Sequence, residues 1–101
     1  AGNEAIRLLA TLRYARLLVA KDAPEDALKA LAISVPAGWG PAFHAVRGDV
    51  YYALGKRNEA RSEYEQALKV AETPGLDRAF IQAKLDDLGG PTTAPAAAPA
   101  P

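Results

Sequence analysis

The sequence predicts an all-α fold made of helix hairpins that stack on one another. A step of 33 residues relates Ala27 and Leu31 to Ala60 and Tyr64, so the chain contains two similar units. Within each unit apolar residues recur at every third or fourth position, which is the spacing of one face of a helix. A helical repeat of this length must stack, because one hairpin alone leaves much of its apolar surface uncovered.

The first hairpin is expected over residues 4–35. Asn3 is a favoured N-cap residue, and the apolar residues that follow it predict a helix over about residues 4–20. Pro24 suits the first turn of a second helix, because its fixed φ fits there and its missing N–H leaves no helical bond unmade. This second helix is expected to end before Pro36.

The second hairpin is expected over residues 41–72, after a connector rich in Pro and Gly. Helical spacing predicts a third helix that ends at Gly55, a residue type common just after a helix C-terminus. A turn is expected at residues 56–58, and a fourth helix after it is expected to end at the Thr-Pro-Gly of residues 73–75.

A fifth helix over about residues 77–88 carries apolar residues on two sides, with Phe80 on one and Ile81 on the other. We expect it to pack as a lid on the second hairpin, which completes a domain over residues 1–88. Residues 89–101 contain only Gly, Pro, Thr and Ala, so they are expected to form a flexible tail with an extended preference.

Small residues recur where the helices of a hairpin should cross. Two helix axes approach within about 8 Å only where one helix contributes little side chain. Gly48, Ala60 and Ala67 are expected at such points in the second hairpin. Glycine inside a helix costs about 1 kcal/mol relative to Ala, which is reasonable if Tyr64 packs over the bare backbone of Gly48. The alternative is that this position simply tolerates glycine.

Composition and charge exclude several classes of function. Lys and Arg number 12 and balance the 12 Asp and Glu, so no net charge attracts nucleic acid. The chain has no Cys, and His44 is its only histidine, which leaves no zinc-ligand set. No activated nucleophile or paired carboxylates appear. We therefore expect no cofactor, no metal and no enzymatic activity.

Residues 41–74 resemble a tetratricopeptide repeat. The residues at that motif's spacing are Gly48, Tyr51, Gly55, Ala60, Tyr64 and Ala67. His44 stands where the motif usually has Trp. Residues 8–36 form a weaker copy, in which Asp22 replaces the turn glycine and Ser34 the last small residue. The resemblance implies a tetratricopeptide-like fragment of an α-solenoid with about five helices.

Three runs are similar to the C-terminal half of the YfgM family: FHAVRGDV at residues 43–50, the segment around Tyr64, and QAKLDDL at residues 82–88. The similarity covers about residues 5–88. It implies an ancillary subunit of the bacterial SecYEG translocon, with one N-terminal membrane helix and a tetratricopeptide-like domain on the periplasmic side of the inner membrane. It also implies association with translocon subunits and the periplasmic chaperone PpiD. Membrane contact would then occur only through an anchor upstream of residue 1.

Stacked hairpins commonly bind proteins on the concave face, which the first helix of each pair lines. Six positions on the first and third helices are expected to face this groove and bind a partner: Leu9, Leu12, Arg16, Asp49, Tyr52 and Ala53. For Arg16 and Asp49, simple solvation explains the sequence equally well. The expected function is thus noncovalent protein binding. The alternative is structural, because two hairpins leave bare end faces that could drive assembly into a homo-oligomer.

Overall fold

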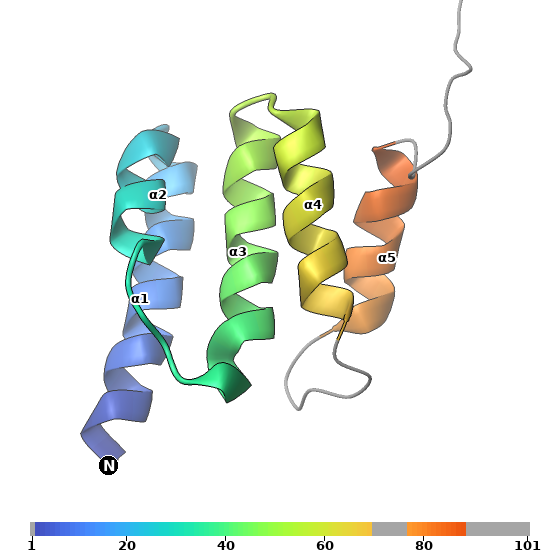
Figure 1. The fold of residues 1–101 in the computed structure, drawn as a ribbon. Coiled ribbons are helices and arrows are strands. Elements are labelled where there is room, and N and C mark those ends of the chain that lie inside the picture. Colours follow the sequence, from blue (N-terminus) through green and yellow to red (C-terminus); the bar gives the residue numbers. More distant parts are fainter. Residues whose placement is uncertain (1, 70–76, 89–101) are drawn as a thin grey trace, which may run out of the picture.

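The computed structural model describes residues 2–69 and 77–88, and these residues form helices without any strand. The all-α prediction is therefore confirmed. The α-helices are α1 (Gly2–Ala20), α2 (Pro24–Leu31), α3 (Gly40–Ala53), α4 (Arg57–Leu68) and α5 (Arg78–Asp87), and a 3-10 helix at Ala37–Trp39 precedes α3 (Figure 1).

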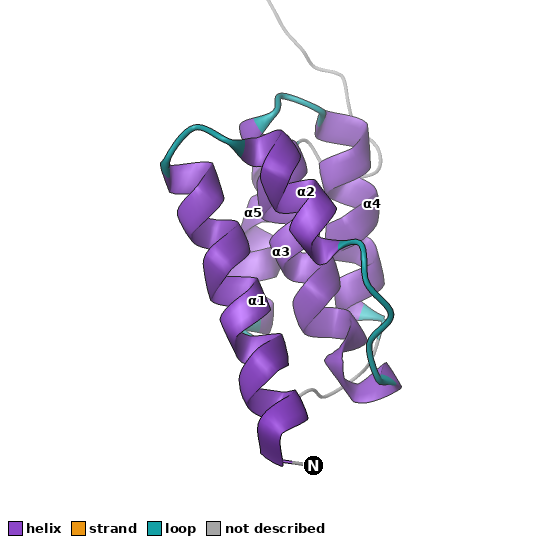
Figure 2. Ribbon diagram, turned by 90° about the vertical axis from the view of Figure 1, so that its left-hand side faces the viewer, coloured by secondary structure: helices purple, strands orange, loops and turns teal. Residues whose placement is uncertain are grey.

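The helices form two hairpins and a closing helix. α1 packs on α2, α3 packs on α4, and α5 packs on the outer side of α4. Figure 2, turned by a quarter, shows α1 on one side of the molecule and both α2 and α4 on the other. The first helices of the hairpins therefore share one face, and the second helices cover the opposite face.

Each hairpin turn depends on one residue with a left-handed backbone. Gly55 has φ of 78° and follows Leu54, the C-cap of α3, which confirms the predicted stop. Asp22, at the same place in the first hairpin, has φ of 67° without being glycine. Asp enters this region more readily than most residues, because its short polar side chain can bond to nearby backbone. The first turn thus keeps the repeat geometry despite the missing glycine.

The core lies on both sides of α3. On one side, Phe43, Val46 and Val50 pack with buried residues of α1 and α2. On the other side, Ala45 packs with buried residues of α4 and α5, among them Tyr64 and Ile81. α3 is therefore the central helix, and the two hairpins are held together through it.

Helices α3 and α4 approach closely where Gly48 meets Tyr64. A Cβ atom built on Gly48 would lie 2.5 Å from the Tyr64 Cε1 atom and 2.6 Å from its Cδ1 atom. Ala60 and Ala67, also in this interface, have no exposed surface. The small residues thus lie at the crossing of α3 and α4, as predicted, and Gly48 is required there because an aromatic ring occupies the space of its missing side chain.

Arginine side chains fasten helix ends to neighbouring helices. The Arg47 guanidinium donates to the Leu31 carbonyl at the end of α2, at 2.7 Å. Arg61 on α4 donates to the Leu88 carbonyl after α5, at 3.2 Å. The last carbonyls of a helix have no partner within the helix, and they carry the negative end of its dipole, so a cation there stabilises it. α5 is thereby held in place by polar contacts as well as by apolar packing.

Two local predictions were wrong. Helix α1 begins at Gly2, so Asn3 lies within the helix and is not its N-cap. Helix α4 begins at Arg57, so Arg57 and Asn58 are helical and the turn is shorter than expected. Helix α2 ends at Leu31, before Pro36 as expected, and Ser34 lies in the connector that follows and is exposed.

The fifth helix is apolar on two sides, but only one side packs. Ile81, Leu85 and Leu88 are buried, whereas Phe80 is 55% exposed. The expected helix end at residues 73–75 and the expected tail at residues 89–101 lie outside the described residues.

Candidate protein-binding cleft

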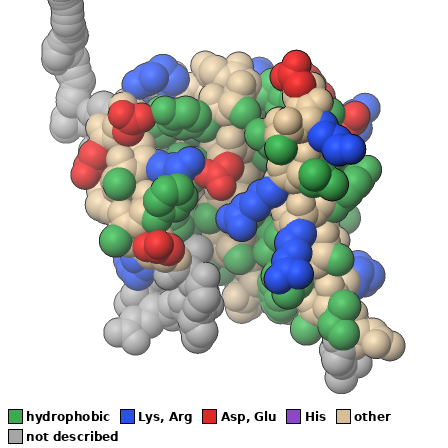
Figure 3. Space-filling view, turned by 180° about the vertical axis from the view of Figure 1, so that it is seen from behind, with side chains coloured by type: hydrophobic (Ala, Val, Ile, Leu, Met, Phe, Trp, Pro, Cys, Tyr) green, Lys and Arg blue, Asp and Glu red, His purple; other side chains and the backbone are tan. Residues whose placement is uncertain are grey.

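A cleft of about 850 Å³ lies between α1, α3 and α5. Figure 3 shows the molecule from behind, where basic and hydrophobic side chains surround a hollow on this face. The cleft exists because α2 and α4 cover the opposite face, which leaves the first helices of the hairpins and α5 open to solvent on one side. Stacked hairpins produce such a concave surface from a small rotation at each repeat.

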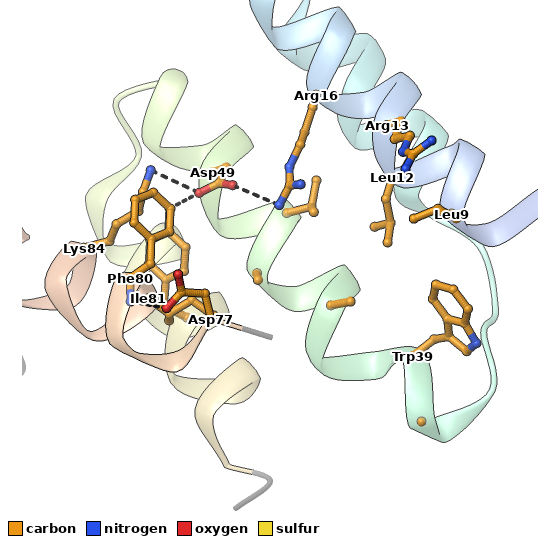
Figure 4. Close-up of a pocket in the computed structure, with 15 residues that line it drawn as sticks. Leu9, Leu12, Arg13, Arg16, Trp39, Asp49, Asp77, Phe80, Ile81 and Lys84 are labelled. Atoms are coloured by element: carbon orange, nitrogen blue, oxygen red, sulfur yellow. Dashed lines mark hydrogen bonds and ion pairs between the residues drawn. The ribbon is translucent and has the colours of Figure 1, made fainter. Parts of the chain in front are cut away.

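Asp49 joins the three walls of the cleft. Its Oδ1 atom accepts a hydrogen bond of 2.6 Å from the Tyr64 hydroxyl on α4 and lies 3.3 Å from the Lys84 Nζ atom on α5. Its Oδ2 atom lies 3.9 Å from an Arg16 nitrogen on α1 (Figure 4). One carboxylate on the central helix therefore bridges to both outer walls, and its charge is balanced by two cations.

The Tyr64 hydroxyl is the most strongly perturbed group of the site. Burial raises the pKa of Tyr64 well above its ordinary value of 10.0, and the hydrogen bond to Asp49 and the charge of that carboxylate raise it further. The hydroxyl therefore stays protonated over the physiological range. It donates to Asp49 and fixes the orientation of the carboxylate inside the cleft.

Lys84 is held at one end of the cleft by aromatic rings. Its Nζ atom lies 4.9 Å from the centre of the Phe80 ring and 5.3 Å from that of Tyr52. Contacts at these distances are favourable cation–π interactions. The Tyr52 hydroxyl donates to Asp87 at 2.8 Å, and this hydrogen bond, followed by the charge of the carboxylate, raises the pKa of Tyr52.

Apolar side chains remain uncovered in the cleft. Leu9 on α1 is 42% exposed and Phe80 on α5 is 55% exposed, while Trp39, which also lines the cleft, is half-buried. Figure 4 shows Trp39 and Leu9 on one side of the opening, and Phe80 on the other. Apolar side chains that line a concavity in this way offer a surface for the side chains of another molecule.

The structure brings four of the six sequence-predicted site residues together. Leu9, Leu12, Arg16 and Asp49 all line the cleft, although Leu12 is only 7% exposed and belongs mainly to the core. Tyr52 does not line the cleft, since it bonds to Asp87 and borders the opening only through Lys84. Ala53, the last residue of α3, is exposed and lies outside the cleft.

Sequence reasoning missed the wall that α5 contributes. Phe80, Ile81 and Lys84 line the cleft together with Trp39, which precedes α3. A signal was present, because a lid helix needs only one apolar face and α5 has two. The second face, with Phe80, lies toward the cleft.

The cleft provides binding groups. Within residues 2–69 and 77–88, no cluster of three or more His, Cys, Asp or Glu side chains is placed to hold a metal ion. The groups that meet in the cleft are guanidinium, ammonium, carboxylate and aromatic, and each is suited to noncovalent contact. Stacked hairpins with a part-apolar, part-charged cleft define a helical-repeat domain for protein interaction.

Comparison with known proteins agrees with this class. Residues 1–90 match the family model described as a tetratricopeptide repeat-like domain. The chain is 36% identical over 83 residues to the ancillary SecYEG translocon subunit of Neisseria gonorrhoeae (strain ATCC 700825 / FA 1090), a match that covers 82% of this chain and 40% of the relative. It is 30% identical over 87 residues to the protein of the same name from Escherichia coli (strain K12), covering 86% of this chain and 42% of the relative. No solved structure gives a significant match.

The chain belongs to the tetratricopeptide repeat-like family and, within it, to the YfgM family of ancillary SecYEG translocon subunits. The predicted resemblance is therefore confirmed. The chain spans about 40% of the length of the curated relatives that it matches. None of the helices in the described residues is both long enough and apolar enough to cross a bilayer.

Proposed function

We propose that this chain is a protein-binding scaffold of the bacterial translocon, and that it holds a partner segment in the cleft between α1, α3 and α5. Its partners would be translocon subunits or a PpiD-like periplasmic chaperone. The chain would act on the periplasmic side of the inner membrane, and binding alone would be its activity. An anchor elsewhere in the full protein would raise the local concentration of the domain near its partners.

The cleft is the single observation that carries this proposal. Phe80 and Leu9 are apolar side chains that stay exposed in a concave site, although both could have been polar at no cost to the core. Arg16, Asp49 and Lys84 surround them with fixed charges. Aromatic and arginine side chains are enriched among the residues that dominate binding energy at protein interfaces.

The setting is supported by the relatives. Both are named ancillary SecYEG translocon subunits, and the aligned region covers more than four fifths of this chain. A subunit described as ancillary is expected to act through association. Because so much of this chain is aligned, we expect a binding role that it shares with these relatives.

Capture of a partner by cleft variants tests the proposal. The chain, tagged and immobilised, is exposed to detergent-solubilised translocon and, separately, to a purified PpiD-like chaperone. Arg16→Glu combined with Phe80→Ala should reduce capture at least tenfold, because it removes an aromatic anchor and reverses a charge in the same cleft. The bound amount is measured by quantitative immunoblotting.

Two variants outside the cleft serve as matched controls. Tyr14→Ala removes an aromatic side chain that is as exposed as Phe80, and Glu65→Lys reverses a charge at an exposed position of α4 that does not line the cleft. Capture that is unchanged by these controls and lost in the cleft variant supports the proposal. Undiminished capture by the cleft variant would place the partner elsewhere.

A second candidate function is self-association, and the outer face of α1 favours it. Ile6, Tyr14 and Leu17 are 68%, 54% and 51% exposed, and they line a shallow apolar depression on this helix. An uncovered apolar helix face of this kind favours contact with a second copy, which would make the chain a structural module.

Light scattering distinguishes the two candidates. Self-association predicts a mass that rises toward that of a dimer with concentration, and that returns to the monomer value in Ile6→Lys/Leu17→Lys. A monomer at every concentration would remove the second candidate and would leave the scaffold proposal in place.

A further inference from the structure

The carboxylates of the cleft already have partners. Asp49 accepts from the Tyr64 hydroxyl at 2.6 Å and lies 3.3 Å from Lys84. Asp77 accepts from the backbone N–H of Phe80 at 3.0 Å, so it is the N-cap of α5. These acidic groups serve the fold, and they leave little capacity to bind a cation from outside.

The arginines on the opposite wall are in a different position. Arg13 lines the cleft and makes no hydrogen bond or ion pair with any residue of the described ranges 2–69 and 77–88. Arg16, one turn further along α1, is 61% exposed and reaches Asp49 only at 3.9 Å. Residues three apart lie on the same side of a helix, and both arginines line the cleft; the Arg16 side chain extends toward Asp49, whereas Arg13 lies near Leu12 (Figure 4).

The charged groups of the cleft that remain available to a ligand are therefore cationic. Asp49 and Asp77 are engaged, whereas Arg13 and Arg16 keep most of their donors available. A guanidinium group binds a carboxylate through two parallel hydrogen bonds, which gives both strength and direction. Charge complementarity thus favours a ligand that presents a carboxylate to the α1 wall.

The apolar surface lies directly beside these arginines. Leu9 is one turn before Arg13 on α1, Trp39 lies on the same side of the opening as Leu9, and Phe80 lies across it (Figure 4). A ligand that covers them must carry apolar side chains next to its carboxylate. The α1 wall from Leu9 to Arg16 is about 10 Å long, at about 1.5 Å per helical residue, and matches about three extended residues.

We propose that the cleft binds an extended peptide segment in which an Asp or Glu side chain is flanked by apolar ones, with the carboxylate on Arg13 and Arg16 and the apolar side chains on Trp39 and Phe80. This inference rests on the proposed function, since it names the kind of segment that a protein partner would supply. Lys84 stays with Asp49 and shapes the far end of the cleft.

Trp39 provides a direct readout, because it is the only tryptophan of the chain and lines the cleft. The probe is a short synthetic peptide with Asp between Leu and Phe, capped at both ends so that only the side chain is charged. A sister peptide carries Asn in place of Asp. Tryptophan emission is followed as each peptide is added, at low and at high salt.

Arg13→Gln/Arg16→Gln is the test variant. Lys21→Gln/Lys29→Gln is its control, because it removes the same charge from exposed positions on the first hairpin outside the cleft. Both variants are checked by circular dichroism for unchanged helix content. We expect the Asp peptide to bind at least about tenfold more tightly than the Asn peptide, and this preference to fall with salt. The preference should disappear in the test variant and persist in the control.

The possible failures are distinguishable. Equal affinity for the two peptides would overturn the acidic preference and would leave the scaffold function standing. A preference that survives in the test variant would overturn the assignment to Arg13 and Arg16. If neither peptide binds, the inference as a whole is overturned. The scaffold function is then decided separately, by the capture of whole partners with the Arg16→Glu/Phe80→Ala variant.

Discussion

Gly48→Ala probes the contact on which the second hairpin depends. Carbon atoms pack best at about 3.5–4.0 Å, yet the new Cβ would lie 2.5, 2.6 and 2.9 Å from three atoms of the Tyr64 ring. Relief requires the ring or the helix to move by about 1 Å. The ring cannot move easily, because it has no exposed surface and its hydroxyl is bound to Asp49 at 2.6 Å.

Two opposing effects set the magnitude. Alanine is favoured over glycine inside a helix by about 1 kcal/mol, which would stabilise the variant. Overpacking a well-filled core costs about 1–3 kcal/mol, and the tethered ring places this site near the upper end. We expect a net loss of about 1–2 kcal/mol, which corresponds to a fall of about 5–15 °C in Tm for a domain of this size.

Thermal unfolding followed by circular dichroism measures this loss. Gly38→Ala is the matched control, because a Cβ atom there meets nothing within 4 Å and its φ is not positive. That control should keep the wild-type Tm or raise it slightly. A Gly48→Ala variant as stable as the control would refute the close approach of α3 and α4.

Three further predictions concern the stability of the same helices. Ala60→Leu adds methylene groups at a position with no exposed surface and should lower Tm by about 5–15 °C in the same assay; an unchanged Tm would remove Ala60 from the crossing. Tyr64 keeps its proton in the folded state above pH 10, where the unfolded chain loses it. Its contribution to the free energy of unfolding is therefore complete below pH 10 and is lost as the pH rises above that value. Above pH 10 the free energy of unfolding of Tyr64→Phe should therefore fall less steeply with pH than that of the wild type, by up to about 1.4 kcal/mol per pH unit in urea titrations. Equal slopes for the two proteins would contradict the burial of the hydroxyl. Asp22→Gly should stabilise the first hairpin by about 1 kcal/mol, because glycine adopts a positive φ without strain; a lower urea midpoint would show that the Asp side chain itself supports the turn.

The helix pairs could be predicted because their sequence signals are local. Apolar spacing defined the helices, and Gly55 marked the end of α3 since its positive φ is a property of one residue. The crossing at Gly48 and Ala60 was also predictable, because a stacked repeat needs small residues at fixed intervals. These features depend on neighbours within one hairpin.

Helix ends were predicted less well, because they depend on tertiary contacts. Asn3 has the chemistry of a cap, but the helix continues past it to Gly2. Ser34 fits the repeat register, yet α2 ends three residues earlier and Arg47 binds the Leu31 carbonyl there. The hydrogen-bond donor at the end of α2 thus comes from an arginine 16 residues further along the chain. The spacing of apolar residues does not indicate such a contact.

The part of the candidate site on α1 and α3 could be predicted from the repeat, whereas the part on α5 depends on tertiary contacts. Leu9, Arg16 and Asp49 lie on the inner helices of the hairpins, where the repeat itself indicates a concave face. Phe80 and Lys84 come from α5, which belongs to neither hairpin, so its position depends on how it packs against α4. The repeat pattern carries no information on that packing.

Site-specific photo-crosslinking tests the binding role of the cleft most directly. A photoreactive phenylalanine analogue replaces Phe80 in the cleft or, as a control, Glu65 on α4. After illumination with solubilised translocon and with the PpiD-like chaperone, position 80 should give a crosslinked partner and position 65 should give none. Crosslinks from position 65 alone would show that partners bind the outer face, and the cleft would then have no part in their capture.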